Sequence, residues 1–462
     1  MPKSLILCDC GGSQAIDPAR FSCVSEVGCS RVHTALCTTQ IEAAATALQA
    51  GDAIIACQQE RDVFVELAEE LDVDQPGFVD LRDRAGWSAP AADTGAKMAA
   101  LAAEALLPTA APSAVDVVSE GVCLIFGTGD VVIPLAQQLA DILAVTALVT
   151  DDADLTQDRR FDVVRGKLKK VSGALGGFDV RINSLQQVQP QGRGGLSMTS
   201  PRDGGSSVCD IVIDLSGDAP MVPAPQKREG YLRADPRDPL AVARLAFDAA
   251  QLTGTFEKPL YVRLEESLCA HSRAEQIGCT NCLDICPTGA ITPDGDHIAI
   301  DPMICAGCGA CAALCPSTAI TYDAPPVAHV LQRMGVLART FRDAGGKNPR
   351  LLIHDEHGAE LIRLAARFSR GLPADVIPLE LDVISGFGHS EMLAALALGF
   401  ASVNIILAPT TERDALTREL VLAEAIAGPG KLVLLDETDP EAMSNALYAF
   451  ETKPSLLEPV LP

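Results

Sequence analysis

The sequence predicts a multidomain chain that combines α/β and α+β domains, and three observations predict it. The chain has 462 residues, which is too long for a single hydrophobic core. Short apolar runs alternate with helix-like stretches towards both ends of the chain, as they do in β-α-β units. Eight of the sixteen cysteines lie between positions 269 and 315, whereas residues 326–452 contain none. We therefore expect several α/β domains and one cysteine-rich segment.

The order of apolar runs divides the chain into five segments. Residues 1–87 read as a cysteine-rich α/β domain, with the strand SLILC, the helix TTQIEAAATALQA and the strand DAIIAC. Residues 88–115 are rich in alanine and proline, which predicts a linker around one helix. Residues 116–258 open with VCLIF, GTGD, PLAQQLADIL and VTALV, a Rossmann-like strand, turn, helix and strand. Residues 259–325 hold the cysteine-rich segment, and residues 326–462 predict a small α/β domain.

Charge and hydropathy exclude some classes of partner. Lys and Arg number 36 against 61 Asp and Glu, a net charge of −25, so we expect neither nucleic acid nor an anionic membrane as a partner. The longest apolar run, 392–408, is broken by Gly399, Ser402 and Asn404 and predicts helix, turn and strand instead of a membrane span. The N-terminus shows no secretory signal, so we expect a cytoplasmic protein. In a reducing compartment its cysteines are expected to bind metal instead of forming disulfides.

The cysteine-rich segment is an internal repeat of an iron–sulfur motif. The bacterial motif reads C-x2-C-x2-C-x3-C-P, and its second copy here is complete at Cys305, Cys308, Cys311 and Cys315. CPTGAIT at 286–292 repeats as CPSTAIT at 315–321. Structural zinc is the alternative, but zinc sites usually consist of two C-x2-C pairs without the trailing x3-C-P.

The first copy lacks one cysteine. Cys279, Cys282 and Cys286 are present, but the repeat offset places Gln276 where the first ligand belongs, and glutamine is a poor ligand for iron. The nearest thiol upstream is Cys269, so we predict that Cys269 takes the place of Gln276. His271 is the alternative ligand.

The spacing also assigns the cysteines to two clusters. Cysteines at intervals of three wrap one cluster, and the cysteine after the longer gap points towards the other cluster. The expected sets are Cys269, Cys279, Cys282 and Cys315 for the first cluster and Cys286, Cys305, Cys308 and Cys311 for the second.

With these motifs, residues 259–325 resemble the bacterial two-[4Fe-4S] ferredoxin domain. The resemblance implies two [4Fe-4S] clusters and electron transfer. Only Gln276 departs from the pattern, which leaves open whether the first cluster is a complete cubane or has lost one iron.

The N-terminal segment carries a second resemblance, in LILCDCGG, LCTTQIE and IIACQQE. These stretches are similar to the N-terminal domain of the flavoprotein subunit of heterodisulfide reductase, which binds a further iron–sulfur cluster. The resemblance implies a third cluster held by Cys8, Cys10, Cys37 and Cys57. The other interpretation, that these cysteines are small buried apolar residues, stays open.

The Rossmann-like segment raises the question of FAD. Gly127 and Gly129 match the first two glycines of G-x-G-x-x-G, but Val132 stands at the third. Asp151 or Asp152 ends the second strand, where a ribose would be held. KLKKVSGALGGFDVRI and DIVIDLSGDAP resemble the flavin domain of the same reductase. FAD bound at Gly127, Gly129 and Asp151 is one interpretation, and a domain that only scaffolds is the other.

These observations favour an electron-transfer protein or oxidoreductase subunit over a stand-alone enzyme, and no catalytic residue stands out. The chain resembles a shortened form of the flavoprotein subunit of heterodisulfide reductase. We expect it to pass electrons between a redox enzyme and another electron carrier, and the resemblance points to formate dehydrogenase as the enzyme. The two alternatives are an accessory protein for metalloenzyme assembly and a flavin-dependent reductase subunit.

Overall fold

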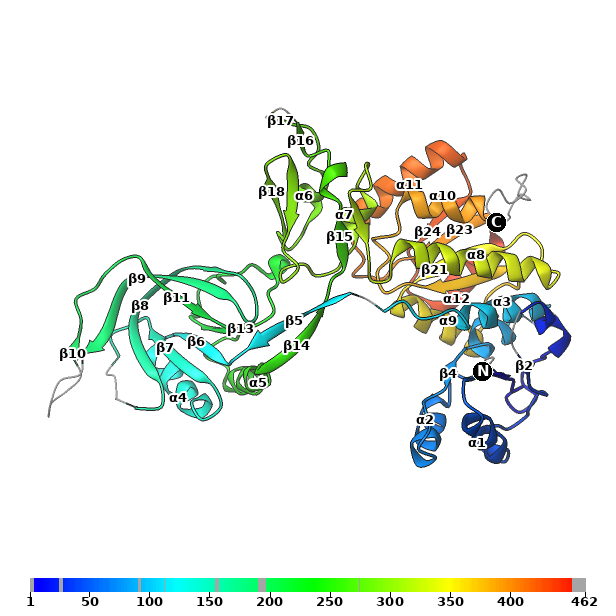
Figure 1. Cartoon of the computed structure of the whole chain (residues 1–462), viewed down its shortest axis with the longest axis horizontal. Helices are drawn as coiled ribbons and strands as arrows, with labels where there is room; N and C mark the ends of the chain where they lie inside the picture. Colours follow the sequence, from blue (N-terminus) through cyan, green and yellow to red (C-terminus); the bar gives the residue numbers. More distant parts are fainter. Residues whose placement is uncertain are drawn as a thin grey trace. The chain divides into compact units, whose positions relative to one another are not determined.

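The protein folds into mixed α/β units. The computed structural model describes residues 4–24, 28–89, 93–111, 113–153, 158–189, 197–273 and 275–450. Its parts form two compact units (Figure 1). The first comprises residues 1–111 together with 308–462, and the second comprises residues 112–307. The mixed α/β class that we predict is therefore confirmed, whereas the five segment boundaries stay predictions.

The N-terminal part of the first unit is a small parallel sheet with the strand order β2-β1-β3-β4. Its elements are β1 (Ser4–Ile6), β2 (Gly28–Cys29), α1 (Ile41–Gln49), β3 (Ala53–Ile55), α2 (Arg61–Glu70) and β4 (Gly77–Phe78), with short helical turns η1 (Pro18–Cys23) and η2 (Arg82–Gly86). The predicted β-α-β unit is present. Ile6 and Ile55 pack with α1 and α2 on one face, while Leu5 and Ile54 pack on the other, as alternation along a strand requires.

The helix expected inside a linker is part of the core. It is α3 (Gly95–Ala105), and residues 96–103 of it are buried. Its alanines leave room for close packing against α8 (Val327–Asp343). One continuous core joins Leu5 of β1, the alanines of α3 and Leu351 of β21. The alanine content of this stretch therefore serves close packing of helices.

The C-terminal part of the first unit is a parallel sheet covered by helices on both faces, with the strand order β22-β21-β23-β24. Its elements besides α8 are β21 (Arg350–His354), α9 (Glu356–Phe368), β22 (Val376–Glu380), α10 (His389–Ala397), β23 (Ser402–Ile406), α11 (Arg413–Ala427), β24 (Leu432–Leu435) and α12 (Pro440–Ala449). The apolar run 392–408 forms α10, a turn at Gly399 with φ +98°, and β23, as predicted. Among the described residues, no helix has the length and hydropathy to cross a membrane.

The second unit is built on a mixed sheet with the order β10-β9-β8-β7-β6-β12-β13, in which β11 also pairs with β9. Its elements are β6 (Val122–Gly127), α4 (Gly129–Leu139), β7 (Ala144–Val149), β8 (Asp162–Ser172), β9 (Phe178–Gln189), β10 (Ser197–Met198), β11 (Gly205–Cys209), β12 (Ile211–Leu215), η3 (Ala224–Gln226), β13 (Tyr231–Arg233) and α5 (Pro239–Ala250). Strands β8, β7, β6, β12 and β13 run parallel, and β9 turns back along β8. The predicted Rossmann-like start is present, but its helix begins at Gly129 instead of Pro134.

Short elements carry the cysteine-rich segment. They are β14 (Gly254–Pro259), which pairs with β5 (Ala114–Ser119), then β15 (Val262–Leu264), η4 (Glu266–Leu268), β16 (Ser272–Arg273), β17 (Gln276–Ile277), α6 (Asn281–Ile285), β18 (Ile291–Asp294), β19 (His297–Ile300), α7 (Ala310–Ala313) and β20 (Ile320–Tyr322). Strands β16 and β17 form one antiparallel hairpin, and β18 and β19 form another. Because this segment has little regular structure, hydrogen bonds outside helices and strands must hold its backbone in place.

Candidate metal centres

The first cysteine motif is held by a buried histidine. The main-chain N–H groups of Gly278 and Cys279 donate to the carbonyl oxygen of His271 at 2.7 and 3.3 Å. The Nδ1 atom of His271 lies 3.0 Å from the carbonyl oxygen of Cys279, and the side chain is only 4% exposed. His271 therefore fixes the backbone that enters the motif. These contacts occupy Nδ1 with the main chain and suit a structural role.

Cys269 and Gln276 lie on either side of this histidine. Cys269 follows the short turn η4 and is half-buried. Gln276 belongs to the hairpin of β16 and β17, where its partner is Arg273, and it is exposed. The residues inserted into the motif thus form a small hairpin. That Cys269 is the ligand stays a prediction.

Two further cysteines of the second unit, Cys286 and Cys305, lie near each other after α6. Cys286 follows the last residue of this helix, and at its other end Thr280 Oγ1 donates a hydrogen bond to Asp284 Oδ2 at 2.7 Å. Burial raises the pKa of the Cys305 thiol, the main-chain N–H of Gly307 lowers it, and the nearby Cys286 raises it. Cys286 and Cys305 are near enough to repel each other as thiolates, as expected for two ligands of one cluster.

The second cysteine motif continues in the first unit, against the C-terminal sheet domain. Gly309, with φ +74°, begins α7, and a Cβ built on it would lie 2.9 Å from the Cα of Gly386. Ser385 Oγ donates to the carbonyl oxygen of Cys308 at 2.5 Å. A Cβ on Gly388 would likewise lie 3.2 Å from Ala313. The loop 385–388 therefore supports Cys308 and the helix behind it by close backbone contact.

Both copies end with the same local contact to sulfur. Cys286 Sγ lies 3.5 Å from Thr288 Oγ1, and Cys315 Sγ lies 3.7 Å from Ser317 Oγ. The main-chain N–H of Ile320 also donates to Cys315 Sγ at 3.4 Å. Hydrogen bonds to the sulfur ligands help to set the potential of an iron–sulfur cluster, so these contacts suit cluster ligands.

Comparison with known families supports iron–sulfur ligation. Residues 277–319 match the 4Fe-4S dicluster domain family, and this range contains seven of the eight predicted cysteines. Cys269 and Gln276 lie outside the matched range. A search of curated proteins finds no match to the chain. Residues 277–319 thus form an iron–sulfur domain of the ferredoxin type, which supports a general role in electron transfer.

The four N-terminal cysteines surround one cavity. Cys8 and Cys10 follow β1, Cys37 precedes α1, and Cys57 follows β3. All four line a cavity of about 260 Å³. A water molecule in the liquid occupies about 30 Å³, so the cavity has room for a group several times larger. The loops at one edge of the parallel sheet have brought together cysteines far apart in the sequence.

The thiols at this cavity influence one another electrostatically. Burial raises the pKa of the Cys57 thiol to about 11, and the neighbouring Cys37, Cys10 and Cys8 raise it further. Burial also raises the pKa of Cys37, helped by Glu60. Thiolates that repel one another are stabilised when metal ions bind among them.

The spacing of side chains at these sites differs from that of a single-ion site. Within the described ranges, no three His, Cys, Asp or Glu side chains are grouped as they would be around one metal ion. In a [4Fe-4S] cluster each thiolate binds a different iron, so the sulfurs stand around the cluster instead of meeting at a point. Cysteines that line a cavity from several sides fit this arrangement.

The sequence analysis missed an arginine at the N-terminal cavity. Arg82 Nη1 donates to Cys10 Sγ at 3.2 Å, and Arg82 lines the same cavity. It follows β4, so it lies at the edge of the parallel sheet where the cysteines also gather. The place of Arg82 a few residues after a strand could have indicated this site from the sequence. The carboxyl ends of parallel strands meet at one edge of a sheet, so residues that follow different strands lie close together there.

The predicted flavin residues take part in packing and capping. Gly127 has φ +154°, and a Cβ there would lie 2.4 Å from the carbonyl oxygen of Leu215. Asp151 Oδ1 accepts hydrogen bonds from the main-chain N–H groups of Gly129, at 3.1 Å, and Ala153, at 3.4 Å. In a dinucleotide site the first amides of this helix face the pyrophosphate. Here the Asp151 carboxylate already accepts the hydrogen bond of the Gly129 amide, and it would repel the negatively charged pyrophosphate of FAD. These residues therefore do not fit FAD.

Proposed function

We propose that this chain relays electrons between a redox enzyme and a second electron carrier through two [4Fe-4S] clusters. The ligand sets are those that the motif spacing assigns. Cys269, Cys279, Cys282 and Cys315 hold the first cluster, and Cys286, Cys305, Cys308 and Cys311 hold the second. The observation that carries the proposal is the dicluster match over residues 277–319.

The N-terminal cavity is the proposed site of a third cluster, held by Cys8, Cys10, Cys37 and Cys57. The support is structural: four cysteines from three separate loops line one cavity. The resemblance to the flavoprotein subunit of heterodisulfide reductase independently points to the same four residues. A third centre would give electrons a further entry or exit site on the chain.

The partners follow from charge and from resemblance. With a net charge of −25, the chain suits protein partners that present positive patches, and not nucleic acid or an anionic membrane. A formate dehydrogenase is the redox enzyme that the resemblance favours. The alternative, a flavin-dependent reductase subunit, is disfavoured by Asp151, which occupies an amide that a flavin pyrophosphate would need.

Anaerobic purification of the full chain tests the proposal. We expect about twelve irons and about twelve sulfides per chain, four of each for every cluster. The dithionite-reduced protein should show the EPR signals of [4Fe-4S] clusters and should reduce an added ferredoxin or viologen acceptor. Zinc in place of iron, or iron that accepts no electrons, would refute the electron-transfer role.

A further inference from the structure

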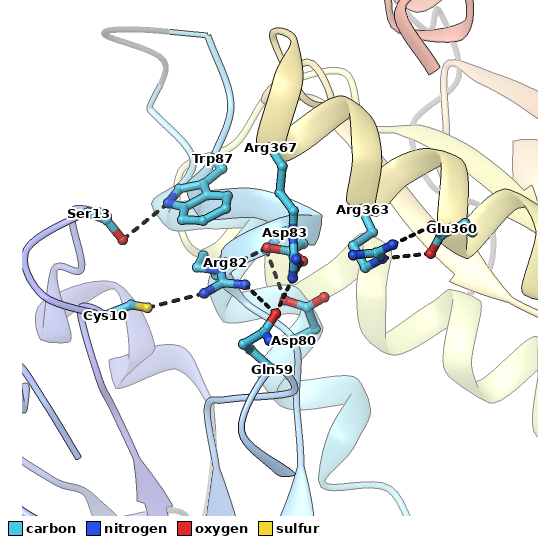
Figure 2. A network of polar contacts seen from close by, with 10 residues as sticks. All are labelled: Cys10, Ser13, Gln59, Asp80, Arg82, Asp83, Trp87, Glu360, Arg363 and Arg367. Carbon is cyan, nitrogen blue, oxygen red and sulfur yellow. Dashed lines mark hydrogen bonds and ion pairs between the residues drawn. The ribbon is translucent and has the colours of Figure 1, made fainter. Parts of the chain in front are cut away.

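Arg82 is held in one orientation beside the N-terminal cysteines. Its Nη1 donates to Cys10 Sγ at 3.2 Å, and its Nε donates to Asp83 Oδ1 at 2.8 Å. Nη2 donates to Gln59 Oε1 at 3.3 Å. The guanidinium lies over the ring of Trp87, with 4.1 Å between its central carbon and the ring centroid. The orientation is thus set by partners on several sides (Figure 2).

The local backbone explains why Arg82 meets both the indole and the sulfur. Residues 82–86 form the π-helical turn η2, which the main-chain N–H of Trp87 closes by donating to the carbonyl oxygen of Arg82 at 2.8 Å. Trp87 Nε1 donates to Ser13 Oγ at 3.2 Å. The turn is therefore tied to the loop that carries Cys10, and π-helical turns are frequent at functional sites.

A second arginine stabilises the carboxylate that holds Arg82. Arg367, from α9, donates to Asp83 Oδ2 at 3.2 Å and also contacts Gln59. The main-chain N–H of Asp83 donates to Asp80 Oδ1 at 2.9 Å. The side chain of Asp83 is only 6% exposed, so this support is shielded from solvent. Figure 2 shows Arg367 reaching this network from α9.

A fixed cation at a cluster sulfur acts on the electron affinity of the cluster. Reduction adds one negative charge to the cluster and its thiolates. A charged hydrogen-bond donor to a sulfur stabilises the reduced state more than the oxidised one, and so raises the reduction potential. Because the side chain of Arg82 is only 13% exposed and is held by Asp83 and Gln59, it needs little reorganisation when the electron arrives.

We propose that Arg82 is a positioning residue that raises the reduction potential of the N-terminal cluster by donating a hydrogen bond to Cys10 Sγ. Asp83, Gln59 and Trp87 hold it in place. The inference rests on the proposed cluster at Cys8, Cys10, Cys37 and Cys57 and adds the group that tunes it. The competing explanation is that Arg82 only supports the fold of the turn.

The test compares Arg82→Gln and Arg82→Lys with the full-length chain by redox titration followed by EPR. The matched control is Arg363→Gln, because Arg363 lies on α9 with Glu360 as its partner and is 41% exposed. The signal of the N-terminal cluster is identified as the one lost in Cys57→Ser. Iron content is measured for every variant.

We expect Arg82→Gln to keep its iron and to lower the equilibrium constant for reduction of this cluster roughly tenfold, which is about 59 mV for one electron. Arg82→Lys should give an intermediate potential, since it keeps the charge but not the planar fork. Arg363→Gln should leave the potential unchanged, and the other clusters should not shift in any of these variants.

Two results would overturn the inference while leaving the proposed cluster standing. One is an unchanged potential in Arg82→Gln at full iron content. The other is loss of the N-terminal iron in both Arg82→Gln and Arg82→Lys, which would make Arg82 a support of the fold. A different result would refute both the cluster and the inference. This would be a Cys57→Ser variant that has the same iron content and the same EPR signals as the unaltered chain.

Discussion

Replacing Cys57 by serine should remove one whole cluster and leave two. Cys57 lines the 260 Å³ cavity with three other cysteines, and burial and its thiol neighbours raise its pKa to about 11. A serine hydroxyl is nearly the same size but is a much poorer ligand for iron, which prefers thiolate. With one ligand lost, the site should lose its four irons, so the content should fall from about twelve irons to about eight per chain.

The assay is iron and acid-labile sulfide per chain after anaerobic purification, together with EPR of the reduced protein. Cys29→Ser is the matched control, because Cys29 is another half-buried cysteine of the first unit that does not line the cavity. It should keep the full iron content. Cys57→Ser with undiminished iron and sulfide would refute the reasoning, because the cavity would then hold no cluster that depends on this thiol.

Three further outcomes are expected. Cys269→Ser should convert one [4Fe-4S] cluster to a [3Fe-4S] form or weaken its binding, whereas Gln276→Ala should leave both clusters of the dicluster segment unchanged. Full [4Fe-4S] EPR intensity in the serine variant would show that Cys269 is not a ligand. Denatured protein should release no flavin, because Asp151 binds the Gly129 amide, and one flavin per chain would contradict this. Burial lowers the pKa of Lys97 from 10.5 to about 7. The unfolded chain therefore binds this proton up to about pH 10.5 while the folded chain releases it above pH 7. The free energy of unfolding should rise by about 1.4 kcal/mol per pH unit across that window, and Lys97→Met should abolish the rise in urea titrations at pH 7 and 9.

Much of the regular structure could be predicted because its signals are local. The apolar runs SLILC and VCLIF form β1 and β6, and the broken run at 392–408 forms a helix, a turn and a strand. The limits of α4 were predicted less well. Its helix begins at Gly129 because Asp151, distant in sequence, binds the first amide. A helix end that depends on a distant side chain leaves no local pattern.

The candidate sites likewise differ in whether a local sequence pattern predicts them. The cysteine spacing at 279–315 points to iron–sulfur clusters on its own, since neighbouring residues of one loop are held near each other by the chain itself. Arg82 carries no motif. The flavin prediction assigned Gly127 and Asp151 to an FAD site, whereas Gly127 packs against Leu215 and Asp151 binds the main-chain N–H of Gly129. Their roles depend on which side chains fill the same space.

By itself, the sequence determined that the chain carries an iron–sulfur domain of the ferredoxin type among α/β domains, because motif spacing and strand and helix periods act over a few residues. Only the tertiary structure decided three other features. Residues 1–111 share a core with residues 308–462, four cysteines from separate loops line one cavity, and Arg82 reaches Cys10 across 72 positions of sequence. The physical reason is that such contacts arise from the joint packing of many side chains, and chain connectivity does not specify them.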